Sequence, residues 1–132
     1  IDCPPSLGIL THNGIVAGNL LLLPVQPGAG AVSGIRMLLE AARELRDEED
    51  VPFRILVTML DLRTSRTNAL FDELLADVRK NQLRTFIARS ESINQANLAG
   101  RPVLLSAPSS RGAWDYEQLC DEIVRLRVPA PA

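Results

Sequence analysis

An aspartate followed by two prolines lies in the opening stretch, Ile1-Asp-Cys-Pro-Pro-Ser-Leu-Gly8. Ile1 and Asp2 are typical of the carboxyl end of a strand, and the prolines restrict the turn that follows. A carboxylate fixed in such a turn can hold Mg²⁺, usually through water, beside a nucleotide phosphate. The residues from Asp2 to Pro5 also make a good turn that binds nothing, and the motif alone does not separate these two interpretations.

Basic side chains gather between Arg63 and Arg89, a segment that contains six of the fourteen lysines and arginines and three acidic residues. Arginines at a surface either contact phosphates or remain solvated. A patch of this size can bind the phosphate backbone of DNA without reading bases, and its affinity then falls steeply as salt rises. An ordinary solvated helix surface accounts for the same residues equally well.

Continuous apolar runs alternate with amphipathic stretches along the chain. Apolar runs predict buried strands at residues 20–26 and 53–60, with shorter candidates at 85–88 and 103–106. Apolar residues three and four apart predict helices around residues 35–45, 70–78 and 119–126. Strands separated by helices indicate right-handed βαβ units. We therefore predict one α/β domain, part of a doubly wound, mostly parallel sheet with helices on both faces.

The composition excludes several classes of protein. Fourteen basic and sixteen acidic residues give a formal charge of −2, which excludes a histone-like polycation and a highly charged disordered tail. Pro24 and Pro27 end the leucine run at 20–23, well short of the roughly 18 apolar residues of a membrane span. Two cysteines, Cys3 and Cys120, make neither a metal cluster nor a disulfide framework, so a cytoplasmic compartment is expected.

Four further motifs follow the opening stretch. They are Leu10-Thr-His-Asn13, Leu22-Leu-Pro-Val-Gln26, Leu56-Val-Thr-Met-Leu-Asp-Leu-Arg-Thr64, and Ala107-Pro-Ser-Ser-Arg-Gly-Ala113 with Tyr116 beyond it. Together with the opening, which is similar to a Walker B and switch II region, they resemble the ParA/Soj family in order and spacing. This family comprises the deviant-Walker partition ATPases related to MinD. The resemblance covers almost the whole chain and implies the P-loop NTPase fold.

The resemblance implies a nucleotide site for ATP and Mg²⁺. Asp2 corresponds to the catalytic Walker B carboxylate near Mg²⁺, and Pro4 and Pro5 to the switch that senses the γ-phosphate. The residues expected beside the adenine are Met59, Pro108, Ser109 and Ser110. An ordinary buried strand residue is an equally good interpretation of Met59, and backbone atoms often make such base contacts.

The resemblance also implies nonspecific DNA binding by a basic patch. The residues expected in this patch are Arg63, Arg66, Arg84 and Arg89. It further implies a homodimer in the ATP state, a ParB-like centromere-binding partner, and a cytoplasmic, nucleoid-associated location without membrane contact. One departure bears on DNA affinity, because Ser92 stands where the family often has an additional arginine.

The glycine-rich loop that carries the family's catalytic lysines has no counterpart in this sequence. Lys80 is the only lysine, and the loop at Gly28 and Gly30 lacks the lysine and hydroxyl residues of a phosphate cradle. We therefore expect residues 1–132 to be the carboxyl-terminal half of a single ParA-type nucleotide-binding domain. We do not expect this chain to hydrolyse ATP by itself, because nothing in it positions the β- and γ-phosphates.

Two alternatives stay open at this point. A truncated, non-catalytic module would still bind DNA or a partner protein through the basic segment. A MinD-like septum-placement ATPase would need a basic amphipathic helix at its carboxyl end to hold a membrane. Against it, residues 118–128 contain Asp121 and Glu122 and are followed by Pro129-Ala-Pro131.

Overall fold

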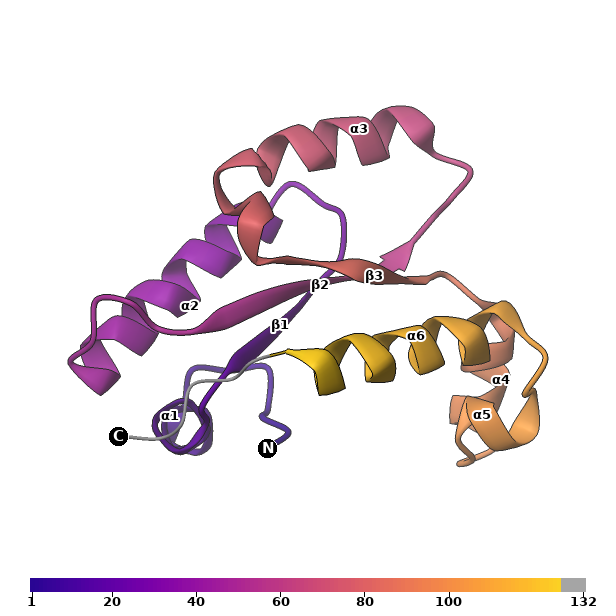
Figure 1. The fold of residues 1–132 in the computed structure, drawn as a ribbon, viewed down its shortest axis with the longest axis horizontal. Helices are drawn as coiled ribbons and strands as arrows, with labels where there is room; N and C mark the ends of the chain where they lie inside the picture. Colours follow the sequence, from indigo (N-terminus) through magenta and orange to yellow (C-terminus); the bar gives the residue numbers. More distant parts are fainter. Residues whose placement is uncertain (127–132) are drawn as a thin grey trace.

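The computed structural model describes residues 1–126. Within these residues, three parallel strands form one sheet in the order β1-β2-β3 (Figure 1). The strands are β1 at Leu21–Val25, β2 at Phe53–Leu60 and β3 at Gln82–Ala88. Three of the four predicted strands are therefore confirmed.

The central strand β2 is buried on both faces. Its consecutive residues Ile55, Leu56 and Val57 are each at most 5% exposed, although successive side chains of a strand point to opposite faces. A strand of this kind needs a covering layer on each side of the sheet. Strand β1 lies at one edge of the described sheet. Pro24 is tolerated there because no further strand of this sheet needs the backbone N–H that proline lacks.

Two helices cover one face of the sheet, α2 at Ala31–Arg46 and α3 at Ser65–Leu74 (Figure 1). The buried residues of α2 are Ile35, Leu39 and Ala42, which join side chains of β1 and β2 in the largest apolar cluster. Burial of each of the larger side chains contributes about 1.5–3 kcal/mol. The helix predicted around residues 35–45 is confirmed.

Helix α6, Arg111–Arg125, lies along the opposite face of the sheet (Figure 1). Its Leu119 packs with Leu56 of β2 and with Leu83 and Ile87 of β3. Helices therefore lie on both faces of a parallel sheet, and the predicted fold class is confirmed.

Carboxylates of α6 also bind the backbone of β3. The Asp115 Oδ2 atom accepts the N–H of Ala88 at 2.9 Å, and the two oxygens of Glu122 accept the N–H groups of Arg84 and Thr85 at 2.8 Å each. These bonds satisfy backbone donors on the side of β3 that faces away from β2. They fix the position of α6 along the strand.

The strand predicted at residues 103–106 is wrong. These residues form the short helix α5, Val103–Ser106, which follows helix α4, Glu91–Leu98. The carbonyl of Pro102 accepts the N–H groups three and four residues further on. Val103 is buried against alanines of α4 and α6, while the two leucines after it are exposed. An apolar run this short does not distinguish a strand from a helical turn.

The helix predicted across residues 70–78 ends early. Helix α3 stops at Leu74, and a separate 3-10 helix, η1, spans Ala76–Asn81. Between them Leu75 is fully buried, and its carbonyl accepts the N–H of Val78 at 3.0 Å. Burial of Leu75 turns the chain back toward the sheet, so β3 begins three residues earlier than predicted.

Residues 1–8 lead into helix α1, Ile9–Ala17, which packs against α2 and contains the motif Leu10-Thr-His-Asn13. They pair with no strand of the described sheet. The Thr11 hydroxyl lies 3.2 Å from the carbonyl oxygen of Pro4 and 2.6 Å from that of Ser6, so it holds this segment against α1.

The predicted proline-rich end at Pro129–Pro131 lies outside the described residues. Within residues 1–126, none of the helices has the length and apolar character that a membrane crossing requires.

Candidate functional site

The loops after β2 and β3 lie at the same edge of the sheet because the strands are parallel. Met59, one residue before the end of β2, has a φ of 52° and is 47% exposed. A non-glycine residue in this left-handed region is uncommon, and the pairing of β2 with β3 shifts register between Val57 and Leu60. Met59 is therefore not a buried strand residue, because the backbone turns its side chain out at the carboxyl edge.

Asp61, directly after β2, organises the following loop. Its carboxylate accepts three hydrogen bonds from Arg63. The donors are the side-chain Nε at 3.0 Å, the side-chain Nη2 at 2.8 Å and the backbone N–H at 3.0 Å. Its carbonyl accepts the N–H and the hydroxyl of Thr64 and the side-chain amide of Asn68. The loop is therefore fixed before α3 begins.

The ion pair with Arg63 sets the electrostatics of this loop. The pKa of the Asp61 carboxyl lies well below its usual range, because the Arg63 side chain and backbone donate to it and the charge of Arg89 adds a smaller effect. Asp61 in turn raises the pKa of the Arg63 guanidinium. The Arg63 side chain is 83% exposed, so a solvated arginine is held in one orientation by a bidentate carboxylate.

Asp61 was not among the predicted site residues. The available signal was its place two residues before Arg63, within the motif that ends at Thr64.

The four arginines predicted to bind DNA do not form one patch. Arg63 and Arg89 both lie at the carboxyl edge, where the N–H of Arg89 donates to the last carbonyl of β2 at 3.0 Å. Arg66 is exposed in the first turn of α3, beside the same loop. Arg84 is exposed further back in β3, next to α6. The structure therefore brings three of the four to one edge and sets Arg84 on another surface.

The predicted adenine-side residues after α5 lie in the loop that starts α6. Ser110 caps this helix, because its hydroxyl oxygen accepts the N–H of Ala113 at 3.2 Å. Pro108 and Ser109 are exposed. Since α6 is hydrogen-bonded near its start to the last residue of β3, this loop lies toward the carboxyl edge.

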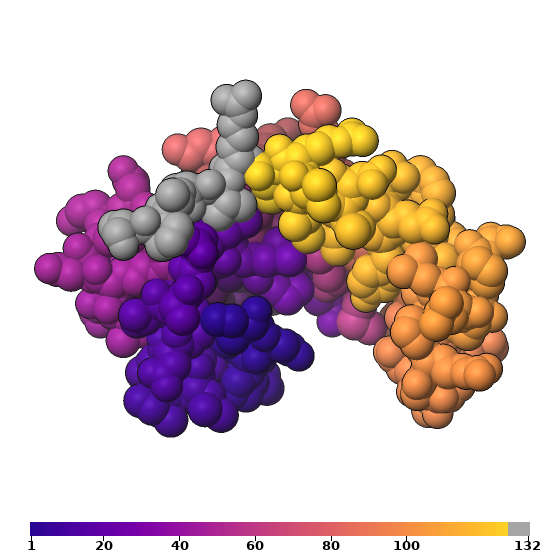
Figure 2. Space-filling model, turned by 60° about the horizontal axis from the view of Figure 1, so that its bottom comes forward, coloured from indigo at the N-terminus to yellow at the C-terminus, as the bar shows by residue number. Residues whose placement is uncertain are grey.

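Asp2, Pro4 and Pro5 are exposed on the amino-terminal segment beside α1, away from the loop before α6 (Figure 1). Figure 2 shows the molecule hollowed between the indigo amino-terminal residues and the orange helices α4 and α5. The structure therefore does not bring Asp2 together with Met59 and Pro108.

Metal ligands are sparse in the part of the chain that the structure describes. No three His, Cys, Asp or Glu side chains of residues 1–126 are placed to bind one metal ion. Asp2 offers Mg²⁺ one exposed carboxylate. A single carboxylate fits Mg²⁺ when waters and nucleotide phosphates supply the remaining oxygens. Residues 1–126 alone therefore do not form a complete nucleotide site.

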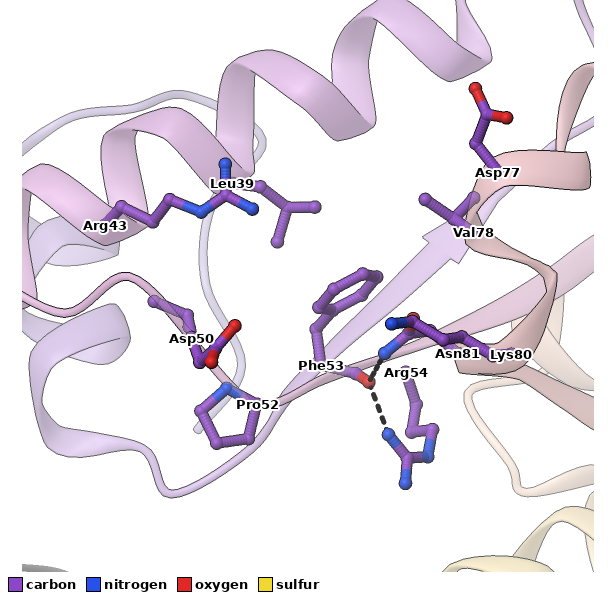
Figure 3. Close-up of a pocket in the computed structure, with 11 residues that line it drawn as sticks. Leu39, Arg43, Asp50, Pro52, Phe53, Arg54, Asp77, Val78, Lys80 and Asn81 are labelled. Carbon is purple, nitrogen blue, oxygen red and sulfur yellow. Dashed lines mark hydrogen bonds between the residues drawn. The ribbon is translucent and has the colours of Figure 1, made fainter.

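A pocket of about 390 Å³ lies at the opposite, amino edge of the sheet, between α2 and η1 (Figure 3). The Phe53 ring projects into it between Leu39 and Val78, while Arg54 is turned away (Figure 3). The Phe53 carbonyl accepts Arg54 Nη1 at 2.8 Å and Asn81 Nδ2 at 3.3 Å. None of the predicted site residues lines this pocket.

Comparisons with known proteins show that the chain is similar to Soj and ParA proteins. A family model described as an AAA domain matches residues 1–55. The sporulation initiation inhibitor protein Soj of Bacillus subtilis is 36% identical, over 93% of this chain and 50% of that protein. The chromosome-partitioning ATPase Soj of Treponema pallidum is 32% identical, over 94% of this chain and 50% of that protein. The chromosome partitioning protein ParA of Myxococcus xanthus is 27% identical, over 98% of this chain and 47% of that protein.

The chain thus spans about half the length of the curated relatives it matches. Among solved structures, the MinD cell division protein of Aquifex aeolicus matches with a TM-score of 0.76, over 98% of this chain and 54% of that chain. At 12% sequence identity this likeness shows the fold alone.

Proposed function

The chain is a relative of the Soj and ParA proteins over nearly its whole length, and from this premise we propose that it is part of an ATP-dependent DNA-partition ATPase. The observation that carries the proposal is the match to Soj and ParA proteins across 93% or more of the chain, two of which are named for chromosome partitioning. The segregated DNA is a plasmid or a chromosome. The parallel sheet supports the proposal, because sheets of this kind bind ligands at the carboxyl edge of their strands.

In this proposal residues 1–132 are the carboxyl-terminal half of one ParA-type nucleotide-binding domain. Support comes from α1, where Ile9, Leu10 and Val16 are 57% or more exposed. Apolar side chains exposed together on one short helix are normally covered by further protein. The complementary half of the domain, with its phosphate loop, covers this face of α1.

On the nucleotide side, Asp2 is the Walker B carboxylate and binds Mg²⁺ through water. Pro4 and Pro5 belong to the switch that senses the γ-phosphate, and Met59 and Pro108 border the adenine. All five side chains are exposed and free to contact a ligand, and the rest of the domain must bring Asp2 toward Met59 and Pro108, because residues 1–126 alone do not. Mg²⁺ supplies charge neutralisation at the phosphates when it is bound.

Two serines complete the proposed adenine side. Ser109 is exposed beside Pro108 and contacts the base directly. The Ser110 hydroxyl is engaged in the cap of α6, so its proposed contact is through the backbone.

On the DNA side, Arg63, Arg66 and Arg89 contact phosphates at the carboxyl edge, and Asp61 keeps the Arg63 guanidinium in one orientation. Arg84 contacts phosphate from its separate position on β3. Contacts of this kind bind DNA without reading its sequence. ATP-dependent dimerisation doubles the number of these contacts, a ParB-like partner stimulates turnover, and the protein is located on the nucleoid.

The nucleotide half of the proposal is tested by Asp2→Ala in the whole protein that contains this chain. Mg²⁺-dependent ATP turnover is expected to be lost while far-ultraviolet circular dichroism is unchanged, because Asp2 is exposed. Asp50→Ala removes an exposed carboxylate from the loop after α2 and serves as the matched control, with turnover expected to stay at the parent level. Undiminished turnover in Asp2→Ala contradicts the proposed role.

A further inference from the structure

A groove of about 190 Å³ runs between β3 and α6. It is lined by residues 84–86 of β3 and by Arg111, Trp114, Asp115 and Gln118 of α6. We name it the α6–β3 groove. Arg84 is the one proposed DNA-contact residue in it, and the other lining residues have no part in the function proposed above.

Arg111 is held in one orientation within the groove. Its guanidinium carbon lies 5.7 Å from the centre of the Phe86 ring and 5.1 Å from that of Trp114. Its Nε donates to Asp115 Oδ1 at 2.6 Å, and the Asp115 side chain is 1% exposed. The terminal amino groups of Arg111 have no hydrogen-bond partner among residues 1–126. They are therefore fixed donors ready for an external acceptor.

Arg84 and Trp114 supply the remaining chemistry. Arg84 is exposed, and no carboxylate of residues 1–126 pairs with its side chain, although its backbone N–H is bound to Glu122. Trp114 is 51% exposed, a large apolar surface left open to water beside two guanidinium groups. Aromatic and arginine side chains together are the residues that most often anchor protein partners.

The acidic residues of α6 decide which anion fits. Glu117 and Asp121 are exposed and lie three residues from Trp114 and Gln118, respectively, so they share this side of the helix. A nucleic acid crossing the groove would bring its phosphates against these carboxylates. A single carboxylate of a peptide can bind Arg84 and Arg111 without approaching the carboxylates of Glu117 and Asp121. The volume of the groove has room for one or two side chains.

We propose that the α6–β3 groove binds a short acidic and apolar peptide segment of a protein partner. One carboxylate of the peptide pairs with Arg84 and Arg111, and a neighbouring apolar side chain packs on Trp114 and Phe86. The proposal stands independently of ATP binding and of DNA binding by Arg63, Arg66 and Arg89, and it is an alternative to the phosphate contact proposed above for Arg84.

Trp114 is the only tryptophan of the sequence, so its fluorescence reports on this groove. The probe is a blocked pentapeptide that alternates glutamate with leucine, titrated to 1 mM into the full chain at about 50 mM salt. A saturable change in Trp114 emission is expected. Arg84→Glu should lower the affinity for the peptide at least tenfold, because it replaces an attractive charge with a repulsive one. Arg101→Glu, on the turn between α4 and α5, is the matched control and should bind as the parent does.

Three results would overturn the proposal. The first is the absence of a saturable change up to 1 mM. The second is equal binding by a peptide in which lysine replaces every glutamate, since this shows that the arginines do not select charge. The third is an Arg84-dependent change with a 20-base-pair DNA duplex and none with the acidic peptide, which assigns the groove to DNA. Far-ultraviolet circular dichroism of Arg84→Glu confirms that a loss of binding is not a loss of fold.

Discussion

Helices α2 and α6 cover opposite faces of the same sheet by different means. Helix α2 presents Ile35, Leu39 and Ala42, three apolar residues at helical spacing, to the strands. Helix α6 also places an apolar side chain on the sheet, but its Asp115 and Glu122 bind backbone N–H groups of β3. One helix is held mainly by apolar contacts and the other by apolar contacts together with carboxylates.

The difference follows from the position of β3 in the described sheet. β3 pairs with β2 on one side, and within residues 1–126 no strand pairs with its other side. Backbone donors on such a side invite pairing with another chain unless something covers them. The carboxylates of α6 occupy three of these donors. Apolar burial determines that a helix packs on a sheet, whereas the carboxylates determine where α6 lies along the strand.

The largest expected effect is on the α2 face. Leu39→Ala should lower the free energy of unfolding by about 3 kcal/mol, because it removes a buried side chain and leaves a cavity. Met37→Ala, on the exposed side of the same helix, should change it by less than about 0.5 kcal/mol. Urea unfolding measures both. Equal effects of the two substitutions would show that α2 does not pack as described.

A smaller loss is expected on the α6 face. Asp115→Ala should cost about 2 kcal/mol of unfolding free energy, because the buried N–H of Ala88 loses its acceptor. Asp121→Ala is the control on the same helix, since its carboxylate is exposed and lies 3.8 Å from Arg125. If Asp115→Ala proves as mild as Asp121→Ala, the carboxylates do not position α6.

Glu122 adds the smallest effect and a pH dependence. Partial burial raises the pKa of Glu122. Hydrogen bonds from the Thr85 side chain and from the backbone N–H groups of Arg84 and Thr85 outweigh this effect, so the pKa lies below its usual value. The stabilisation is therefore present above the unfolded-state pKa of about 4.3 and is lost as the pH falls through the lower folded-state value.

Glu122→Gln should accordingly lower the free energy of unfolding by about 1 kcal/mol at pH 7. The difference from the parent should shrink below about pH 4, where the parent carboxylate is protonated. Urea unfolding at a series of pH values measures it. A difference that stays constant down to pH 3 contradicts the role of the Glu122 charge.

Sequence periodicity predicted the apolar packing of α2 on the sheet, but it did not predict the hydrogen bonds from β3 to the carboxylates of α6. The spacing of Ile35, Leu39 and Ala42 indicates a buried helix face without knowledge of its neighbours. The contacts of Asp115 and Glu122 with β3 span 27 and 37 or 38 residues, and no local pattern reports such pairings. The strand prediction at 103–106 failed because three apolar residues and a serine suit a helical turn as well as a strand.

The candidate site divides in the same way. The sequence patterns located the end of β2 correctly, with Met59 just before it and Arg63 in the loop just after it, because a strand end is a local feature. They did not reveal the positive φ of Met59 or the pairing of Arg63 with Asp61, which depend on backbone geometry. Nor did the clustering of arginines in sequence reveal that Arg84 lies apart, because β3 carries it away from the carboxyl edge.

Binding to nonspecific duplex DNA tests the central claim most directly. In the whole protein with ATP and Mg²⁺, the double substitution Arg63→Glu and Arg66→Glu should weaken binding at least tenfold. It should also reduce the slope of log K against log salt concentration by about 2, one for each lost phosphate contact. Arg79→Glu lies in the same segment but in η1, which precedes β3 and so is away from the carboxyl edge, and it should leave both quantities near the parent values. An unchanged affinity and salt slope in the double variant would contradict DNA binding by this edge.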